Sequence, residues 1–229
     1  MIEGPPILTI RRSLTRVNAD LLSGFQDAMT GHLVDAMDGR GALDRAVKPH
    51  DPARASICGP ALTVFCYPAD NLALLAACAQ VQPGDIVVCT TDGHLQAAVT
   101  GDLLLGMLKN AGAAALVTDA TIRDQSGVEA VGLPIFHAGV TPNSPASVGP
   151  GSIGLPITCG GVRIDSGDIV VGDRDGVVIV PHAQAAATLA RLQRVRAAEV
   201  KLEAAVKAGL KVPDHIAELL ASDRIGWVD

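Results

Sequence analysis

The central part of the chain, residues 84–124, alternates between apolar runs and short polar turns, a pattern that predicts a βαβ unit. Gly84 to Thr90 is rich in β-branched residues and precedes a Thr-Asp-Gly turn signal. From Leu95 to Lys109 apolar residues recur at helical spacing, and Gly112 is a suitable helix stop. Ala113 to Val117 is then a second buried strand. We therefore expect two parallel strands with a helix packed over them.

The segments on either side of this unit predict helices before it and short strands after it. The expected elements are an extended arm over 1–18, helices over 21–29, 32–37 and 71–79, and strands over 62–67 and 134–137. Residues 139–151 contain three prolines and are too broken for regular structure. Four β runs, over 153–158, 162–164, 168–171 and 176–180, are separated by Gly-containing turns. Such spacing indicates an antiparallel or mixed second sheet.

The last quarter of the chain predicts a long helix over 182–207, which ends near Gly209, and a short helix over 213–220. We expect neither half of the remaining chain to close a core alone, and therefore one layered α/β domain over residues 1–181. Residues 182–229 would form a helical arm that acts as a lid or as a contact between subunits.

Composition excludes several classes of function. Aromatic residues make up 2% of the chain and the formal net charge is -6, which argues against nucleic-acid binding. No apolar run reaches the roughly 20 residues that span a bilayer, and the N-terminus lacks a signal-peptide layout, so we expect a cytoplasmic protein without a membrane partner. The five cysteines form no CxxC pair and are expected to be buried, reduced thiols.

Two polar clusters flank the βαβ unit. Arg123-Asp124 follows the apolar segment that ends at Ile122, where it is either a solvated turn or a site in which Asp124 holds a divalent cation and Arg123 grips a carboxylate. Asp102 follows Gly101 and either caps a helix or carries a proton beside free backbone amides, which would bind an anion.

Other polar residues have mostly structural interpretations. His94 lacks a second ligand at metal-binding spacing and is expected to be a turn residue near a pocket. His137 ends a strand and could point into the same pocket. The Gly172–Gly176 segment is expected to be a hairpin turn rather than a calcium loop. Glu199 and Glu203 share one face of the long helix, where solvation is the simplest interpretation.

The spacing of these residues resembles a known family. Asp102, then twenty residues, then Arg123-Asp124 is similar to the D-X20-R-D signature of the class II pyruvate aldolases, and the later Gly-Asp-Arg-Asp-Gly-Val-Val run at 172–178 supports the likeness. These enzymes cleave 4-hydroxy-4-methyl-2-oxoglutarate and 4-carboxy-4-hydroxy-2-oxoadipate. Their superfamily includes oxaloacetate decarboxylases and the non-catalytic regulator of ribonuclease activity A.

The resemblance implies a fold, an assembly and a set of roles. The fold would be a three-layer β/β/α sandwich similar to the phosphohistidine swivelling domain, assembled as a homotrimer or homohexamer with shared active sites. Asp124 would bind Mg²⁺ or Mn²⁺, and Arg123 would contact the 2-keto acid and stabilise the pyruvate enolate. The amides of Gly101 to Leu104, including Leu103, would hold the substrate carboxylate, and Asp102 would position a metal-associated water as the acid/base. Glu199 of a neighbouring subunit would assist catalysis, and Glu203 is the second candidate for that role.

Three functions therefore stay open at the level of sequence. The first is a metal-dependent lyase that forms pyruvate by retro-aldol cleavage and also decarboxylates oxaloacetate. The second is a ribonuclease-binding regulator without catalysis, and the third is a metal-dependent lyase or dehydratase for sugar acids. Retention of Asp102, Arg123 and Asp124 favours the enzyme.

Overall fold

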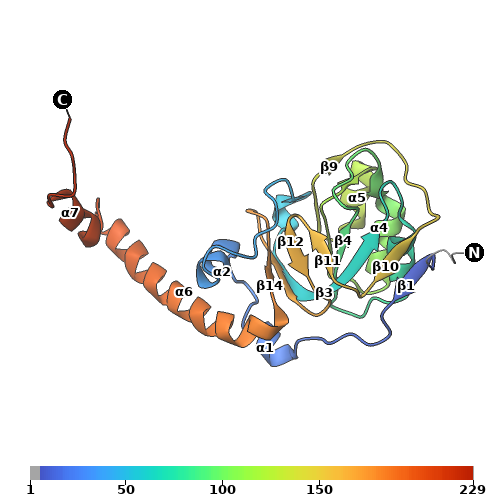
Figure 1. The fold of residues 1–229 in the computed structure, drawn as a ribbon, viewed down its shortest axis with the longest axis horizontal. Coiled ribbons are helices and arrows are strands. Elements are labelled where there is room, and N and C mark those ends of the chain that lie inside the picture. The colour runs from blue at the N-terminus through green and yellow to red at the C-terminus, as the bar shows by residue number, and fades with distance from the viewer. Residues whose placement is uncertain (1–5, 229) are drawn as a thin grey trace, which may run out of the picture.

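The longest strand, β3 (Ile57–Cys66), lies at the centre of the computed structural model, which describes residues 6–228 (Figure 1). Its second half pairs in parallel with β4, and β6 and β8 continue the parallel sheet. The bounds are β4 (Ile86–Thr90), β6 (Ala115–Thr118) and β8 (Ile135–His137). β2 (Lys48–Pro49) closes one edge, and β10 (Gly151–Ile153) with β1 (Leu8–Ile10) closes the other. The predicted parallel pair is confirmed as β4 and β6.

The first half of β3 belongs to a second β layer. It pairs antiparallel with β13 (Ile169–Gly172), which forms a hairpin with β14 (Val177–Val180). A second hairpin, β11 (Ile157–Cys159) with β12 (Val162–Ile164), packs over the parallel sheet. The predicted antiparallel sheet and the hairpin turn at 172–176 are both confirmed. The predicted single run over 153–158 is wrong, because a turn with Gly154 at φ +81° divides it into β10 and β11.

Helices cover the other face of the parallel sheet. They are α3 (Leu72–Ala77), α4 (Asp102–Asn110) and α5 (Gln125–Val131). Alternation along β4 shows why both faces are covered: Val87 and Cys89 lie in the core under the helices, whereas Ile86 and Val88 lie in the core between the β layers. All four side chains are buried. This layering confirms the predicted β/β/α sandwich.

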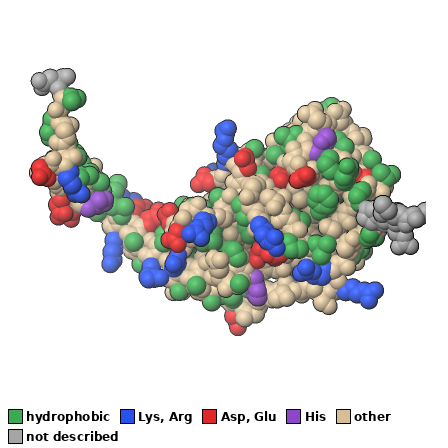
Figure 2. Space-filling model, viewed as in Figure 1, with side chains coloured by type: hydrophobic (Ala, Val, Ile, Leu, Met, Phe, Trp, Pro, Cys, Tyr) green, Lys and Arg blue, Asp and Glu red, His purple; other side chains and the backbone are tan. Residues whose placement is uncertain are grey.

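Two further helices cover the outer face of the β13–β14 hairpin. α2 (Thr30–Ala36) and the start of α6 (Ala185–Lys207) share a core with that hairpin, next to α1 (Ala19–Ser23). Buried residues of α6 end at Leu192, and beyond it the helix projects from the body towards α7 (Asp214–Leu220) (Figure 1). Hydrophobic side chains are exposed along this projecting part (Figure 2), including Val200 and Val206. Within residues 6–228, no helix is long and apolar enough to cross a membrane.

The predicted helix over 95–109 begins later than expected. Its first part contains a short strand, β5 (Ala98–Thr100), and α4 begins only at Asp102. β5 pairs in parallel with β7 (Thr121–Ile122), which pairs with β9 (Gly139–Val140). Val99 fits the helical spacing by coincidence, since it is buried as a strand residue beneath α4. The first N-terminal helix is shorter than the predicted 21–29 and covers 19–23, whereas the second covers 30–36 and begins two residues before the predicted 32–37.

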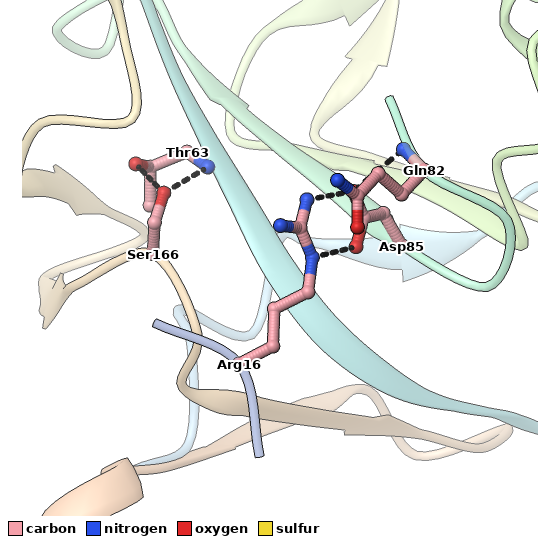
Figure 3. A network of polar contacts seen from close by, with 5 residues as sticks. All are labelled: Arg16, Thr63, Gln82, Asp85 and Ser166. Atoms are coloured by element: carbon pink, nitrogen blue, oxygen red, sulfur yellow. Dashed lines mark hydrogen bonds and ion pairs between the residues drawn. The ribbon is translucent and has the colours of Figure 1, made fainter. Parts of the chain in front are cut away.

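Residues 6–18 of the predicted extended N-terminal arm are held against the body by the pairing of β1 with β10 and by an ion pair. Arg16 donates to both carboxylate oxygens of Asp85, at 3.0 and 2.7 Å, and the Asp85 side chain is 1% exposed (Figure 3). The backbone amide of Gln82 donates to the same carboxylate. Figure 3 also shows Thr63 of β3 hydrogen-bonded to Ser166 of the turn before β13. These contacts fix the arm and the turn on either side of β3.

Candidate active site

The small sheet β5-β7-β9 explains how the twenty-residue spacing brings two polar clusters together. β5 and β7 run parallel, so their carboxyl ends meet at one edge. Thr100 is the last residue of β5 and pairs with Ile122, the last residue of β7. The Arg123 amide donates to the Thr100 carbonyl at 3.0 Å. Gly101 and Arg123 therefore leave the sheet side by side.

α4 begins where β5 ends, and its first turn offers backbone amides. Gly101 is the N-cap and has no side chain to accept from these amides. Asp102 Oδ1 accepts from the Leu103 amide at 2.8 Å, and the first i→i−4 bond runs from Leu105 to Gly101. The amides before it have no intrahelical acceptor, and the helix dipole favours negative charge here. This helix start therefore suits a carboxylate group.

Arg123 and Asp124 form the other side of the site. Asp124 has left-handed backbone angles, φ 58° and ψ 46°, and is the N-cap of α5 without capping it through its side chain. A left-handed non-glycine residue is strained by about 1 kcal/mol, although aspartate tolerates it better than most. Its carboxylate instead lies 3.2 Å from Arg123 Nε, and the two side chains are 45% and 38% exposed. A strained, partly exposed carboxylate beside an arginine is available to a ligand.

A cavity of about 250 Å³ joins these groups. Its lining includes the first turn of α4, Arg123, Asp124, and three residues from other segments, Asn71, Leu75 and Pro145. Leu103 and Met107 stand at the cavity with 77% and 49% exposure, so one wall is apolar and open. This volume suits a small organic acid rather than a nucleotide.

A buried aspartate fixes the loop that carries Pro145. Asp70, 3% exposed, accepts hydrogen bonds from the Val148 and Gly149 amides at 2.6 and 3.0 Å. The loop also reaches the site through Ser144, which accepts from Arg123 Nη1. The sequence analysis missed Ser144, Pro145 and Asn71 as site residues, because the only signal at 139–151 was that the segment is irregular. The place of Ser144 and Pro145 depends on Asp70, which holds amides 78 and 79 positions further along the chain, and no local pattern reveals this contact.

Two glycines allow the acidic residues to approach the backbone. A Cβ at Gly101 would lie 2.3 Å from Asp124 Oδ2, and a Cβ at Gly127 would lie 2.3 Å from Asp102 Oδ2. Real Cβ atoms do not come this close, so any side chain at either position must displace the carboxylate. Gly101 has extended angles, φ -135° and ψ -166°, which other residues adopt readily. The requirement for glycine at 101 is therefore one of space.

The acidic residues fit a hard divalent cation bound with few protein ligands. Over the described part of the chain, no three His, Cys, Asp or Glu side chains cluster at metal-binding distance. Asp124 is a single, accessible carboxylate oriented along the cavity wall. Mg²⁺ binds in this way, through one or two carboxylates with water and substrate oxygens completing its shell. The residues present are thus compatible with Mg²⁺ or Mn²⁺ and unlike a zinc site.

The remaining sequence candidates lie elsewhere in this chain. Glu199 forms an ion pair with His32 of α2, and Glu203 pairs with Lys207 one helical turn away. Neither glutamate lines the cavity. His137 Nε2 lies 3.1 Å from Nδ1 of His50, a residue that the sequence analysis did not identify, and neither histidine nor His94 lines the cavity.

A larger cleft of about 440 Å³ lies between α2 and α6 and contains none of the residues of the D-X20-R-D pattern. We assign the candidate site to the smaller cavity because it unites two carboxylates, an arginine and the backbone amides of a helix start. A large volume alone does not indicate a catalytic site, whereas polar side chains that converge on one cavity do.

Comparison with known proteins places this geometry in context. Residues 30–179 match the model of a family described as RraA-like, Aldolase/RraA. A Halalkalibacterium halodurans protein, named "Putative 4-hydroxy-4-methyl-2-oxoglutarate aldolase", is 36% identical over 193 residues, which cover 84% of this chain and 91% of that protein.

Solved structures show the same architecture. The crystal structure of Streptomyces coelicolor RraAS2, described as an unusual member of the RNase ES inhibitor RraA protein family, matches with a TM-score of 0.73 and 28% identity over 82% of this chain and 98% of that chain. The RNA-processing inhibitor RraA from Thermus thermophilis matches with a TM-score of 0.62 and 24% identity, over 68% of this chain and 93% of its own. This second likeness concerns the fold alone.

Proposed function

The chain belongs to the RraA-like family, and from this premise and the cavity geometry we propose that it is a divalent-metal-dependent carbon–carbon lyase. Its substrate would be a 4-hydroxy-2-keto diacid similar to 4-hydroxy-4-methyl-2-oxoglutarate, and one product would be pyruvate. The observation that carries the proposal is the meeting of Asp102, Arg123 and Asp124 at one cavity. The name of the 36% identical relative supports the same chemistry.

Arg123 and the start of α4 would bind the pyruvate half of the substrate. The first turn of α4 lines the cavity and Gly101 provides no side-chain cap, so the amides of Gly101 to Leu104 would hold the C1 carboxylate once Asp102 Oδ1 releases the Leu103 amide. The Arg123 guanidinium would lie against the keto oxygen, where negative charge develops as the C3–C4 bond breaks. A preorganised cation at that position lowers the barrier more than it strengthens ground-state binding.

Asp124 would hold Mg²⁺ or Mn²⁺ at the same end of the cavity. When bound, the ion supplies Lewis acidity that polarises the 2-keto group. The Asp124 carboxylate needs no movement to face the cavity. The left-handed backbone at Asp124 and the absence of a Cβ at Gly101 already orient it there.

Asp102 would carry the protons. The C4 hydroxyl loses its proton, the C3–C4 electron pair passes to the pyruvate enolate, and the second carbonyl product leaves. The enolate then takes a proton at C3 to give pyruvate. Loss of CO₂ from oxaloacetate leaves the same enolate, so oxaloacetate decarboxylation is expected as a side activity. Asp102 lines the cavity beside the expected position of the C1 carboxylate. From there it would exchange protons, through a water, with the C4 hydroxyl and with C3.

The exposed wall of the cavity suggests that a second subunit completes the site. Leu103 and Met107 would pack against a neighbouring copy in a trimer or hexamer, and Glu199 from that copy's α6 would assist proton transfer. In this chain Glu199 lies on the projecting half of α6, held by His32 and half-exposed, which suits a residue that serves another subunit.

The decisive experiment is a pyruvate-coupled assay with 4-hydroxy-4-methyl-2-oxoglutarate and with oxaloacetate, in the presence of Mg²⁺ or Mn²⁺. Asp124→Asn is the sharpest variant, since asparagine tolerates the left-handed backbone and removes only the charge. We expect EDTA, Asp124→Asn and Arg123→Gln each to lower kcat/KM by about 10²-fold or more. Full activity in both variants would refute the proposal. A panel of sugar acids would reveal the dehydratase alternative.

Ribonuclease binding is a second candidate, favoured by the likeness to RraAS2 and its inhibitor family. A pull-down with a ribonuclease E-type enzyme distinguishes the two. Ribonuclease binding together with neither lyase activity nor Mg²⁺ affinity would replace the enzyme with the regulator.

A further inference from the structure

The cleft of about 440 Å³ between α2 and α6 is a second concave site on this chain. Its floor is formed by β14 and the β12 strand, and its walls by the turn that follows α2 and by the first two turns of α6. This lining shares no residue with the cavity that contains Asp102 and Asp124. The two sites are therefore separate.

Three arginines converge on this cleft. Arg191 of α6 is fixed by two acceptors, the Asp38 carboxylate at 2.7 Å and the Ala36 carbonyl at 3.3 Å. Arg163 of β12 is 72% exposed and has one distant acidic neighbour, Asp165, at 3.7 Å. Arg40 lines the cleft, and it forms no ion pair or side-chain hydrogen bond within the described residues.

The charge of the cleft is opposite to that of the protein. Asp38 is the one acidic residue in its lining, so three arginines and one aspartate leave a formal charge of +2, whereas the whole chain carries -6. A positive concavity on a negative protein attracts small anions selectively. Arginine is also the cation best suited to carboxylate and phosphate groups, because its planar fork donates two parallel hydrogen bonds.

The turn that presents Arg40 is held rigidly against the floor. Gly41, on the C-terminal side of Arg40, has φ +87°, and its carbonyl accepts from the Ile179 amide at 2.8 Å. A Cβ at Gly41 would lie 2.6 Å from the Ile179 carbonyl oxygen, so the turn packs directly on β14. Arg40 is thus supported by a fixed backbone rather than by a mobile loop.

Apart from Gln184 and Thr188, the rest of the lining is apolar. Met37, Val162, Ile179 and Pro181 contribute side chains to the cleft, and Ala187 contributes one from α6. An apolar surface with a few convergent charged groups is the usual composition of a small-molecule site, and the volume lies in the usual range. A bare inorganic ion would leave this apolar surface in contact with water, whereas an anion with a hydrocarbon body would cover it.

We propose that the cleft between α2 and α6 binds a small organic anion, a carboxylate or phosphate group on an apolar body, with Arg40 and Arg163 as its principal ligands. Arg191 adds charge from the α6 side while it keeps its bond to Asp38. The site is independent of the lyase activity proposed above, because its residues lie outside that cavity.

Isothermal titration calorimetry with benzoate and with phenyl phosphate tests the site, and benzyl alcohol serves as the uncharged counterpart. We expect saturable binding of at least one anion to the full chain and weaker or no binding of the alcohol. Arg40→Gln and Arg163→Gln should each weaken anion binding by about tenfold, because each removes a charge-assisted hydrogen bond. A preference for benzoate or for phenyl phosphate identifies the anionic group.

Three controls make the test specific. Arg12→Gln removes an exposed arginine outside the cleft and should leave anion affinity unchanged. Arg123→Gln should also leave it unchanged, since that residue belongs to the other cavity. Arg12, Arg40 and Arg163 are exposed and Arg123 is half-buried, and equal melting temperatures would show that the variants are folded.

Several results would overturn the proposal. These are no saturable binding of either anion, loss of binding in Arg123→Gln with retention in Arg40→Gln and Arg163→Gln, or equal loss in Arg12→Gln. Light scattering adds a further outcome. If Arg40→Gln or Arg163→Gln changes the oligomeric state, the cleft is a contact between copies of the chain and not a ligand site.

Discussion

The α-carbon of Gly101 faces the Asp124 carboxylate so closely that a methyl group on residue 101 would lie 2.3 Å from Asp124 Oδ2. The two residues belong to different turns, one after β5 and one after β7, and the parallel pairing of these strands brings them together. The proposed metal position thus depends on the absence of a side chain at residue 101.

Gly101→Ala should therefore lower metal affinity without harming the fold. Alanine accepts the extended backbone at this position, so we expect the melting temperature to change by a few degrees at most. The displaced Asp124 carboxylate should weaken Mg²⁺ binding and lyase kcat/KM by about tenfold or more. Gly106→Ala is the matched control. Its new methyl group has a nearest neighbour at 3.9 Å, and this helical substitution should stabilise the protein by about 0.5–1 kcal/mol. Equal activity in the two variants would contradict this account.

Gly127→Ala separates the role of Asp102 from that of the metal ligand. The new methyl group would lie 2.3 Å from Asp102 Oδ2, so the carboxylate must move away from its present position. If Asp102 carries protons, kcat should fall by about 10²-fold while Mg²⁺ affinity stays near that of the wild type. Steady-state kinetics and a Mg²⁺ titration measure the two quantities. A parallel loss of both would place Asp102 with the metal instead.

The ion pair between Arg16 and Asp85 should contribute strongly to stability. Arg16→Ala would leave the Asp85 carboxylate, 1% exposed, without its main partner, and we expect a loss of about 2–3 kcal/mol in the free energy of unfolding. The hydrogen bond from Arg16 to Asp85 also raises the pKa of the guanidinium, so Arg16 stays charged at every pH of interest. Urea unfolding of Arg16→Ala, Asp85→Asn and the double variant gives the coupling energy, expected at about 1–3 kcal/mol. Additive losses would show that the two side chains act independently.

His137 should make stability depend on pH. Burial and, to a smaller extent, the neighbouring His50 together lower its pKa from 6.5 to about 4. The Gly139 amide donates to His137 Nδ1, so the neutral ring carries its proton on Nε2, 3.1 Å from His50 Nδ1. The unfolded chain binds a proton below pH 6.5 and the folded chain only near pH 4, so this contribution is complete above pH 6.5 and is lost as the pH falls towards 4.

The expected loss over that pH window is at most about 3 kcal/mol. His137→Gln should show a smaller decrease in the free energy of unfolding between pH 7 and 4 than the wild type does. His215→Gln, at an exposed position of α7, should follow the wild type. Parallel pH curves for all three proteins would exclude His137 as the cause.

The sequence by itself determined the layers of this protein. The apolar runs at 86–88, 113–117, 169–171 and 177–180 contain no polar residue, and such strands are typical of sheets that are covered on both faces. The hairpin at Gly172–Gly176 was also predictable, because turn chemistry is local. The meeting of Asp102 with Arg123-Asp124 was suggested by a resemblance in spacing, and the parallel pairing of β5 and β7 supplies its geometric basis.

Only the tertiary structure decided where α4 begins and what surrounds the cavity. The helical spacing of Val99 concealed β5, since a strand beneath a helix and a helix itself both bury their apolar residues. Ser144 and Pro145 reach the site because Asp70, far earlier in the chain, holds the following amides. Contacts between distant segments leave no periodicity in either segment, so local patterns cannot encode them. The same holds for the arginine cleft, whose residues come from a turn, a hairpin and a helix that only packing brings together.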